Sequence, residues 1–164
     1  LAHLEHMMTL LEEVESQVRD LDTLAFSIYY HDIVYSSARS DNEHQSALFF
    51  EKHVSRTSFK NTLACKNQIE LTKEHLPSED NDINILMDLD LSILGSSPVD
   101  YDTYQKNIRK EYSIFPDFMY KTGRVKMLES ILNSDYIFKT SYFQDKLECQ
   151  ARLNLDNELM SLKL

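Results

Sequence analysis

The sequence predicts an all-α fold, a helical bundle with a further helical extension at its C-terminal end. Only two Gly and three Pro occur in 164 residues, and strand-like alternation between turn clusters is hard to find. Apolar residues recur instead at steps of three and four along most of the chain. At this length a single domain over 1–164 is the simplest organisation, with a core over about 1–97 and the extension over about 98–164.

The first two predicted helices occupy residues 2–20 and 21–35. In the first, glutamates lie opposite an apolar stripe made by Leu4, Met7, Met8, Leu11, Val14 and Val18. The second, "LDTLAFSIYYHDIVY", is apolar nearly all round, which predicts a helix buried in the middle of the molecule. It carries His31 and Asp32 near its C-terminal end. The chain opens inside a helical pattern, which is compatible with a missing upstream segment.

Polar or Gly- and Pro-containing segments separate six further predicted helices. The loop "SSARSD" precedes the third helix, and "LPSEDND" with Pro77 ends the fourth. Gly95 and "SSP" stop the fifth. These six helices are expected over 42–57, 59–75, 83–94, 99–114, 116–133 and 140–163. Most Tyr and Phe side chains are expected in the core.

Charge and composition exclude several classes of partner. Lys and Arg total 17 against 27 Asp and Glu, a net charge of −10, which opposes binding to nucleic acid polymers and to anionic membrane surfaces. No run of apolar residues is long enough for a membrane span. Cys65 and Cys149 are isolated and have no CxxC spacing, so both are expected to be inert thiols of a cytoplasmic protein. Apolar surface on the C-terminal helices would suit a homodimer.

Isolated polar side chains interrupt the apolar helices at three places. They are His3 on the first helix, His31 and Asp32 on the second, and Asp88 and Asp90 on the fifth. Burying such groups is costly unless they are paired or bind a metal. Residues two apart on a helix point in nearly opposite directions, so we expect Asp90 and not Asp88 to face a site. Two imidazoles and two carboxylates would suit a divalent transition metal of the Mn, Fe, Co, Ni or Zn type.

This order along the chain, His, then His-Asp, then Asp, resembles the HD superfamily of metal-dependent phosphohydrolases. Across nearly the whole chain the sequence is similar to a branch of small bacterial proteins described as predicted metal-dependent HD phosphohydrolases. The matching segments are His31-Asp32-Ile33-Val34-Tyr35, "DNEHQSA" at 41–47, "DLDLSILG" at 88–95, "Y..Y...IRKEY" at 101–112, Gly123-Arg124 and "ARLNLDNEL" at 151–159.

The resemblance implies an HD-type bundle and a set of site residues. The metal ligands it implies are His3, His31, Asp32 and Asp90, with His6 as the fallback for the first of them. Glu43 and His75 become candidates for the wall of the site, and Arg109 and Arg124 become candidate phosphate contacts, since guanidinium binds phosphate bidentately. A metal-activated water would then hydrolyse a small phosphorylated compound, with a nucleotide as the expected class, and Asp32 or Glu43 would orient that water.

Plainer interpretations of the same residues stay open. His75 could be a cation at a helix end, and Glu43 could stabilise the N-terminus of its helix. Ion pairing with nearby acids is as good an explanation of Arg109 and Arg124 as phosphate binding. The whole chain could be a metal-binding, non-hydrolytic protein that binds or senses a nucleotide or a protein partner. It could also be an acidic helical interaction protein without a metal.

Overall fold

The computed structural model describes residues 2–163, which form helices and connections without any strand. Helix accounts for 72% of it, so the predicted all-α class is confirmed. The elements are α1 (Ala2–Val14), η1 (Glu15–Gln17), α2 (Leu21–Tyr30), α3 (Asn42–Val54), α4 (Thr62–Leu71), α5 (Asn81–Leu91), η2 (Ser92–Gly95), α6 (Pro98–Glu111), α7 (Asp117–Leu132) and α8 (Ser141–Lys163), where η marks a short 3₁₀ turn. Within the described part of the chain, no helix is long and apolar enough to cross a membrane.

The chain divides into two compact units, Leu1–Asp90 and Leu91–Leu164, hereafter unit 1 and unit 2. The division falls near the end of α5. Unit 1 therefore holds α1 to α5, apart from the last residue of α5, and unit 2 holds η2 and α6 to α8.

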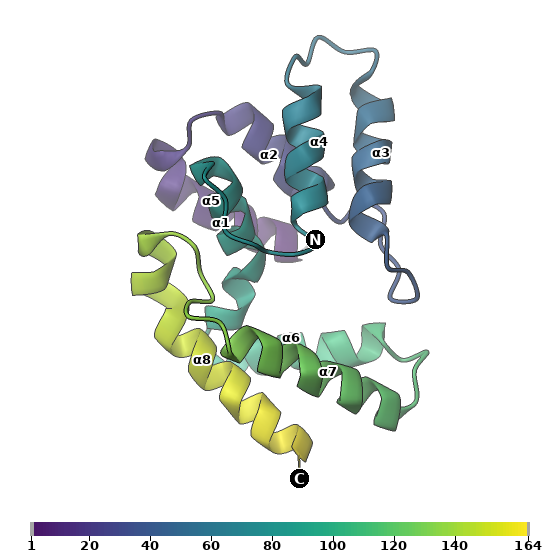
Figure 1. Cartoon of the computed structure of the whole chain (residues 1–164), viewed down its shortest axis with the longest axis vertical. Helices are drawn as coiled ribbons and strands as arrows, with labels where there is room; N and C mark the ends of the chain where they lie inside the picture. The colour runs from purple at the N-terminus through teal and green to yellow at the C-terminus, as the bar shows by residue number, and fades with distance from the viewer. Residues whose placement is uncertain (1, 164) are drawn as a thin grey trace. The chain divides into compact units, whose positions relative to one another are not determined.

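In unit 1, α3 and α4 lie side by side as a helical hairpin, and α2 packs against α4 (Figure 1). A buried cluster between α3 and α4 contains Ala47, Phe50, Val54, Cys65 and Ile69. Of the apolar stripe predicted on the first helix, Met7, Leu11 and Val14 are buried, and the other three members are half-buried. Burial of these stripes removes apolar surface from water and supplies most of the driving force for packing.

α1 ends at Val14, earlier than the predicted 2–20, and one 3₁₀ turn follows it. A side chain from α5 prevents the helical path from reaching residue 20. The Asp82 carboxylate accepts hydrogen bonds of 2.9 Å from the backbone N–H groups of both Arg19 and Asp20. These amides donate to a carboxylate and not to the preceding turn, so the helix cannot continue through them. Asp20 then becomes the N-cap of α2.

α2 ends at Tyr30, so the predicted helix over 21–35 was too long. His31 is the C-cap, and the chain then leaves the helical path. The Ser46 hydroxyl on α3 accepts a hydrogen bond from Val34 N–H and lies 3.3 Å from the Val34 carbonyl oxygen, which it can donate to. The Ser46 side chain on α3 thus satisfies backbone groups of Val34 that would form hydrogen bonds within the helix if α2 were longer. The His-Asp pair consequently lies in the turn after α2 and not within the helix.

The prediction that the second helix is buried in the middle of the molecule was also wrong. One face of α2 is buried, at Thr23, Leu24, Ser27 and Ile28. The opposite face carries aromatic residues that are open to solvent, with Phe26 37% exposed and Tyr29 60% exposed. An apolar side chain on a helix does not reveal which way the helix is turned, because about half of the surface of a folded protein is apolar.

α4 spans Thr62–Leu71, where 59–75 was predicted, and the three residues after it form turns. α5 begins at Asn81, before the predicted start at residue 83, because the Asp80 carboxylate accepts a hydrogen bond from Asp82 N–H at 3.1 Å and caps the first turn. The last predicted turn of that helix is the 3₁₀ turn η2.

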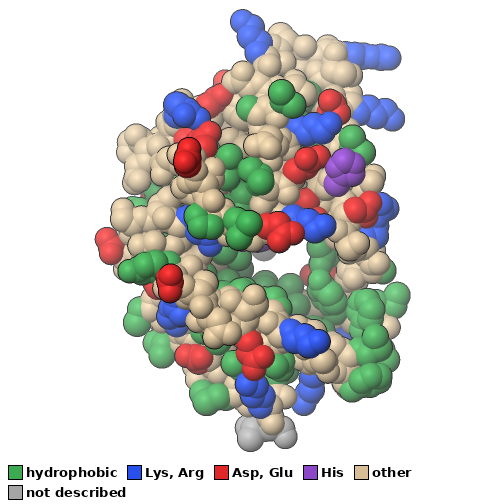
Figure 2. All heavy atoms as spheres, in the orientation of Figure 1, with side chains coloured by type: hydrophobic (Ala, Val, Ile, Leu, Met, Phe, Trp, Pro, Cys, Tyr) green, Lys and Arg blue, Asp and Glu red, His purple; other side chains and the backbone are tan. Residues whose placement is uncertain are grey.

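In unit 2, α7 and α8 pack together, and α8 also packs against η2 (Figure 1). Gly95 permits this second contact, because a Cβ atom at that position would lie 2.6 Å from the Cβ of Leu147. Ser97 caps α6, and Pro98 occupies its first turn. Hydrophobic side chains gather where α6 meets α7 in Figure 2, and the exposed apolar residues there include Ile114 of the connection and Phe118 in the first turn of α7.

Candidate metal centre

Three side chains from separate parts of unit 1 converge on one point. Asp90 comes from the last turn of α5, His3 from the first turn of α1, and His31 from the turn after α2. His3 Nε2 lies 3.0 Å from Asp90 Oδ1, and His31 Nε2 lies 3.5 Å from the same oxygen. One potential ligand atom from each of the three residues lies within 4.8 Å of the other two.

The His31 ring is held by the backbone on one side and faces the carboxylates on the other. Its Nδ1 lies 2.8 Å from the carbonyl oxygen of Ile28, which can only accept, so Nδ1 carries a proton. In the neutral ring, the Nε2 lone pair then points toward Asp90 and Asp32. The side chain is 5% exposed, and among the described residues Nε2 has no hydrogen-bond partner. This orientation, with one nitrogen fixed by a carbonyl group, is the one that metal-binding histidines usually have.

Charges of opposite sign stabilise each other in this cluster. Burial lowers the pKa of His31, but the Asp90 and Asp32 carboxylates raise it by more than burial lowers it, so the pKa rises to about 9. Burial raises the pKa of Asp90, yet the three imidazoles around it lower it well below its usual range. Asp90 is therefore an ionised carboxylate, and without a metal a protonated His31 balances it. A divalent cation could take the place of that proton.

Asp32 and Glu43 stand beside the three-residue group. Asp32 Oδ2 lies 3.5 Å from His31 Nε2, and its side chain is 48% exposed. Burial raises the pKa of Asp32, and the negative charges of Asp90 and Glu43 add to this effect. Glu43 lies in the first turn of α3 and is half-buried. Asp32 thus offers an accessible carboxylate next to the cluster, with Glu43 close enough to influence its charge.

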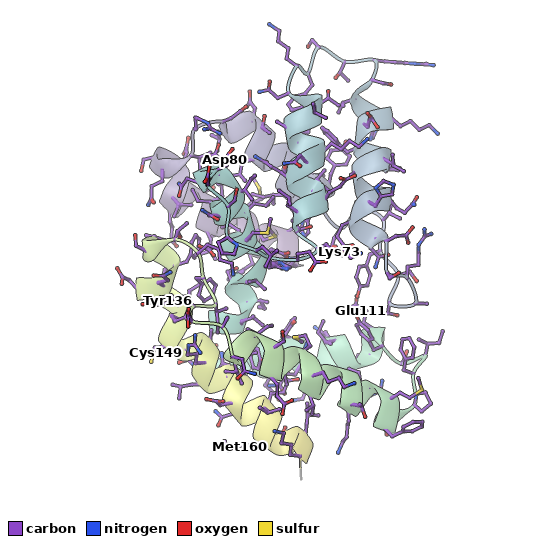
Figure 3. All side chains as sticks on the ribbon, viewed as in Figure 1. Lys73, Asp80, Glu111, Tyr136, Cys149 and Met160 are labelled. Atoms are coloured by element: carbon purple, nitrogen blue, oxygen red, sulfur yellow. The ribbon has the colours of Figure 1, made fainter. Side chains whose placement is uncertain are left out.

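His75 contacts Asp90 from the other side. Its Nε2 lies 2.9 Å from Asp90 Oδ2, the oxygen that His3 and His31 leave free. His75 belongs to the connection between α4 and α5, two residues after Lys73, which is labelled in Figure 3. Its φ of 48° is the only positive value for a non-glycine residue in the described chain. Such a backbone is unfavourable for His and persists only where surrounding contacts hold it.

The structure also places the two alternatives that the sequence left open. Asp90 faces the imidazoles, whereas Asp88 is completely buried elsewhere on α5. His3, the first choice on α1, contacts Asp90 through its Nε2. The argument from helix geometry thus selected the carboxylate that the fold brings to this cluster.

Arg109 and Arg124 lie in unit 2, and both guanidinium groups have protein partners. Arg109 pairs with Asp117 through Nε and Nη2 and donates to the carbonyl oxygens of Tyr112 and Phe115. Arg124 is 7% exposed and binds Glu158 in a bidentate pair, with N–O distances of 2.7 and 3.0 Å. These contacts are the ion pairs that the sequence offered as the alternative. Phosphate binding by either residue stays a prediction.

The donor set at the cluster suits a transition metal. Imidazole nitrogens and carboxylate oxygens together bind Mn, Fe, Co, Ni and Zn, and they do not by themselves select one of these. His31 Nε2 is buried, makes no hydrogen bond within the described residues and lies 3.5 Å from carboxylate oxygens of Asp32 and Asp90, so its nitrogen is placed where a cation held by these carboxylates could bind it.

Sequence reasoning overlooked a groove on unit 1 beside α2. Its aromatic residues were assigned to the core, although Asp22, Phe26 and Tyr30 follow one another at steps of four and therefore share one side of the helix. One acidic and two aromatic residues on the same side of a helix form the sequence pattern that could have predicted this groove.

Compared with known protein families, with curated proteins and with solved structures, the chain matches none.

Proposed function

We propose that this chain is a metal-dependent phosphohydrolase that acts on a small phosphorylated compound, with a nucleotide as the expected class. The order and spacing of His3, His31, Asp32 and Asp90 support this proposal through their similarity to the HD superfamily. A reducing compartment such as the cytoplasm agrees with two cysteines that form no disulfide.

The observation that carries the proposal is the convergence of His3, His31 and Asp90. Asp90 is 87 residues from His3 in sequence, yet their side chains meet at 3.0 Å. A merely structural ion pair needs one imidazole, whereas Asp90 has three around it. One potential ligand atom from each of His3, His31 and Asp90 lies within 4.8 Å of the other two, which is close enough for one cation to contact all three.

Each residue has a distinct part in the proposed reaction. His3, His31, Asp32 and Asp90 would hold the metal. A bound divalent metal supplies Lewis acidity toward a phosphoryl oxygen and lowers the pKa of a water molecule. Asp32, half exposed beside His31, would orient the attacking water, and Glu43 could accept its proton. His75 would keep Asp90 in place through its contact with Oδ2.

The test is hydrolysis of a chromogenic phosphoester and of a nucleotide panel by purified protein supplied with Mn²⁺ or Co²⁺. We expect turnover with a metal, and we expect His31→Ala and Asp90→Asn each to reduce kcat by at least about 100-fold, because ligand loss removes the metal chemistry. The matched control is His44→Ala, since the His44 side chain is 56% exposed and pairs with Glu70 on the surface. It should hydrolyse the substrates at the wild-type rate.

Elemental analysis of the same samples separates the alternatives. Bound metal without turnover of any phosphoester would replace the proposed enzyme with a metal-binding protein that senses a ligand. Protein that neither retains nor gains a metal would instead support a helical interaction protein. Turnover that persists in both ligand variants would remove this cluster from the reaction.

A further inference from the structure

A groove of about 640 Å³ opens on unit 1, between α2 and the connection from α3 to α4. Asp22, Phe26 and Tyr30 line it from α2, and Phe59 and Lys60 line it from the connection. The volume lies within the range of about 300–1,000 Å³ typical of small-molecule sites. None of the proposed metal ligands lines this groove, so an inference about the groove does not rest on the proposed hydrolase activity.

Aromatic rings form the wall of this groove. The ring centroids of Phe26 and Phe59 are 4.7 Å apart, and those of Phe26 and Tyr30 are 6.3 Å apart in a stacked arrangement. Tyr30 is fixed further by a 3.0 Å contact between its hydroxyl and His53 Nδ1. Several aromatic faces held in fixed positions around one space can attract a cation through their negative quadrupoles.

The charged groups at the rim favour the same kind of ligand. Asp20 is held ionised by Thr23 and Asn61, whose hydrogen bonds lower its pKa. Within residues 2–163, no hydrogen bond or ion pair occupies the Asp22 carboxylate or the Lys60 ammonium group. Two carboxylates against one lysine make the rim negative, and the chain as a whole carries a net charge of −10.

We infer that this groove binds a small organic ammonium compound with a flat or apolar body, its body against Phe26, Tyr30 and Phe59 and its positive charge near Asp22. The aromatic wall supplies contact area and cation–π attraction, and the acidic rim supplies charge complementarity. Lys60 opposes the ligand charge and therefore weakens binding.

The first test is a titration of the full chain with phenethylammonium at pH 7, where its amine is protonated, followed by NMR or calorimetry. Binding with a Kd of about 1 mM or below is expected. The neutral analogue 2-phenylethanol should bind about fivefold or more weakly, because it lacks the charge. Equal affinity for both compounds, or no binding of either, would overturn the inference.

Variants on the two sides of the groove make the test specific. Asp22→Asn should weaken phenethylammonium binding about two- to fivefold, and Lys60→Gln should strengthen it. The matched control is Asp156→Asn, which removes the same charge from an exposed position on α8 and should leave the affinity unchanged. A groove that instead prefers phenylacetate and loses that preference in Lys60→Gln would show that its ligand is an anion.

Discussion

One carboxylate organises the candidate metal centre at the scale of single residues. Both oxygens of Asp90 are engaged by imidazoles, with His3 and His31 near Oδ1 and His75 at Oδ2. The side chain is 16% exposed, so its charge is stabilised mainly by these neighbours and little by water. Replacing this one acid therefore removes the shared partner of three rings at once.

We expect Asp90→Asn to abolish stabilisation by metal. A ligand present at 100 times its Kd stabilises the folded state by about 2.7 kcal/mol, which corresponds to a rise in Tm of roughly 5–10 °C for a chain of this size. Differential scanning fluorimetry with and without Co²⁺ measures this rise. The exposed variant Asp145→Asn should keep it. A full metal-induced shift in Asp90→Asn would show that the ion binds elsewhere.

The two cysteines should differ strongly in reactivity. Cys65 is completely buried, and burial raises the pKa of its thiol to about 12. The reactive thiolate is therefore scarce at pH 8. Cys149, labelled on α8 in Figure 3, is exposed. Native iodoacetamide treatment followed by mass spectrometry should modify Cys149 within minutes and Cys65 only after unfolding. Equal rates at pH 8 would contradict the burial of Cys65.

At the scale of elements, the sequence predicted which segments are helical better than where the helices end. Periodicity located helices such as α1 because their apolar residues recur at helical steps and are buried on one face. The ends depend on side chains distant in sequence, such as Asp82, which captures two amides after α1, and Ser46, which satisfies Val34 after α2. No local pattern contains these partners. The helix ends were therefore predicted with errors of several residues at 2–20 and 21–35.

The two glycines should respond in opposite ways to alanine. At Gly95 a Cβ would lie 2.6 Å from the Cβ and 3.0 Å from the carbonyl oxygen of Leu147, so Gly95→Ala should destabilise the protein by about 1–3 kcal/mol. Gly123 lies inside α7, and a Cβ added there would meet no atom within 4 Å, so Gly123→Ala should stabilise the protein by about 0.5–1 kcal/mol. Urea unfolding measures both changes. Destabilisation by both substitutions would contradict this account of Gly123.

Arg124 and Glu158 form a buried ion pair that joins α7 to α8, and the Tyr101 hydroxyl from α6 donates to the same carboxylate. Removing one partner leaves a buried charge, so Arg124→Met should cost about 3–5 kcal/mol. The double variant Arg124→Met with Glu158→Leu should recover most of that loss, because no charge is then left unpaired. Denaturant unfolding of the single and double variants tests this. A double variant no more stable than Arg124→Met would show that the two charges do not act as a pair.

At the scale of the whole molecule, the candidate metal centre lies within unit 1. The sequence predicted a common site for His3, His31, Asp32 and Asp90 from isolated polar groups on apolar helices and from the resemblance to the HD superfamily. It did not predict that both oxygens of Asp90 would be contacted, since the position of His75 depends on a turn with a positive φ. The groove beside α2 was missed because exposed and buried aromatic residues look alike in a sequence.

Metal binding should protect unit 1 from hydrogen exchange. An ion held by His3, His31 and Asp90 ties together α1, the end of α2 and α5, and opening any of these would break the site. Exchange monitored by mass spectrometry should slow in these three helices when Co²⁺ is added. The Asp90→Asn variant, which lacks one proposed ligand, serves as the control and should show no slowing when Co²⁺ is added. Slowing confined to α6–α8 would contradict the placement of the ion.

The long separation between His3 and Asp90 has a consequence for how the protein matures. His3 and Asp90 are 87 residues apart, so the intervening chain must fold back before both side chains can reach one ion. Closing such a loop costs conformational entropy, which is offset only when the helices of unit 1 have packed together. A half-collapsed chain with native helices therefore lacks the binding site. Visible Co²⁺ absorption during refolding would mark the last assembly step, later than the recovery of helical circular dichroism.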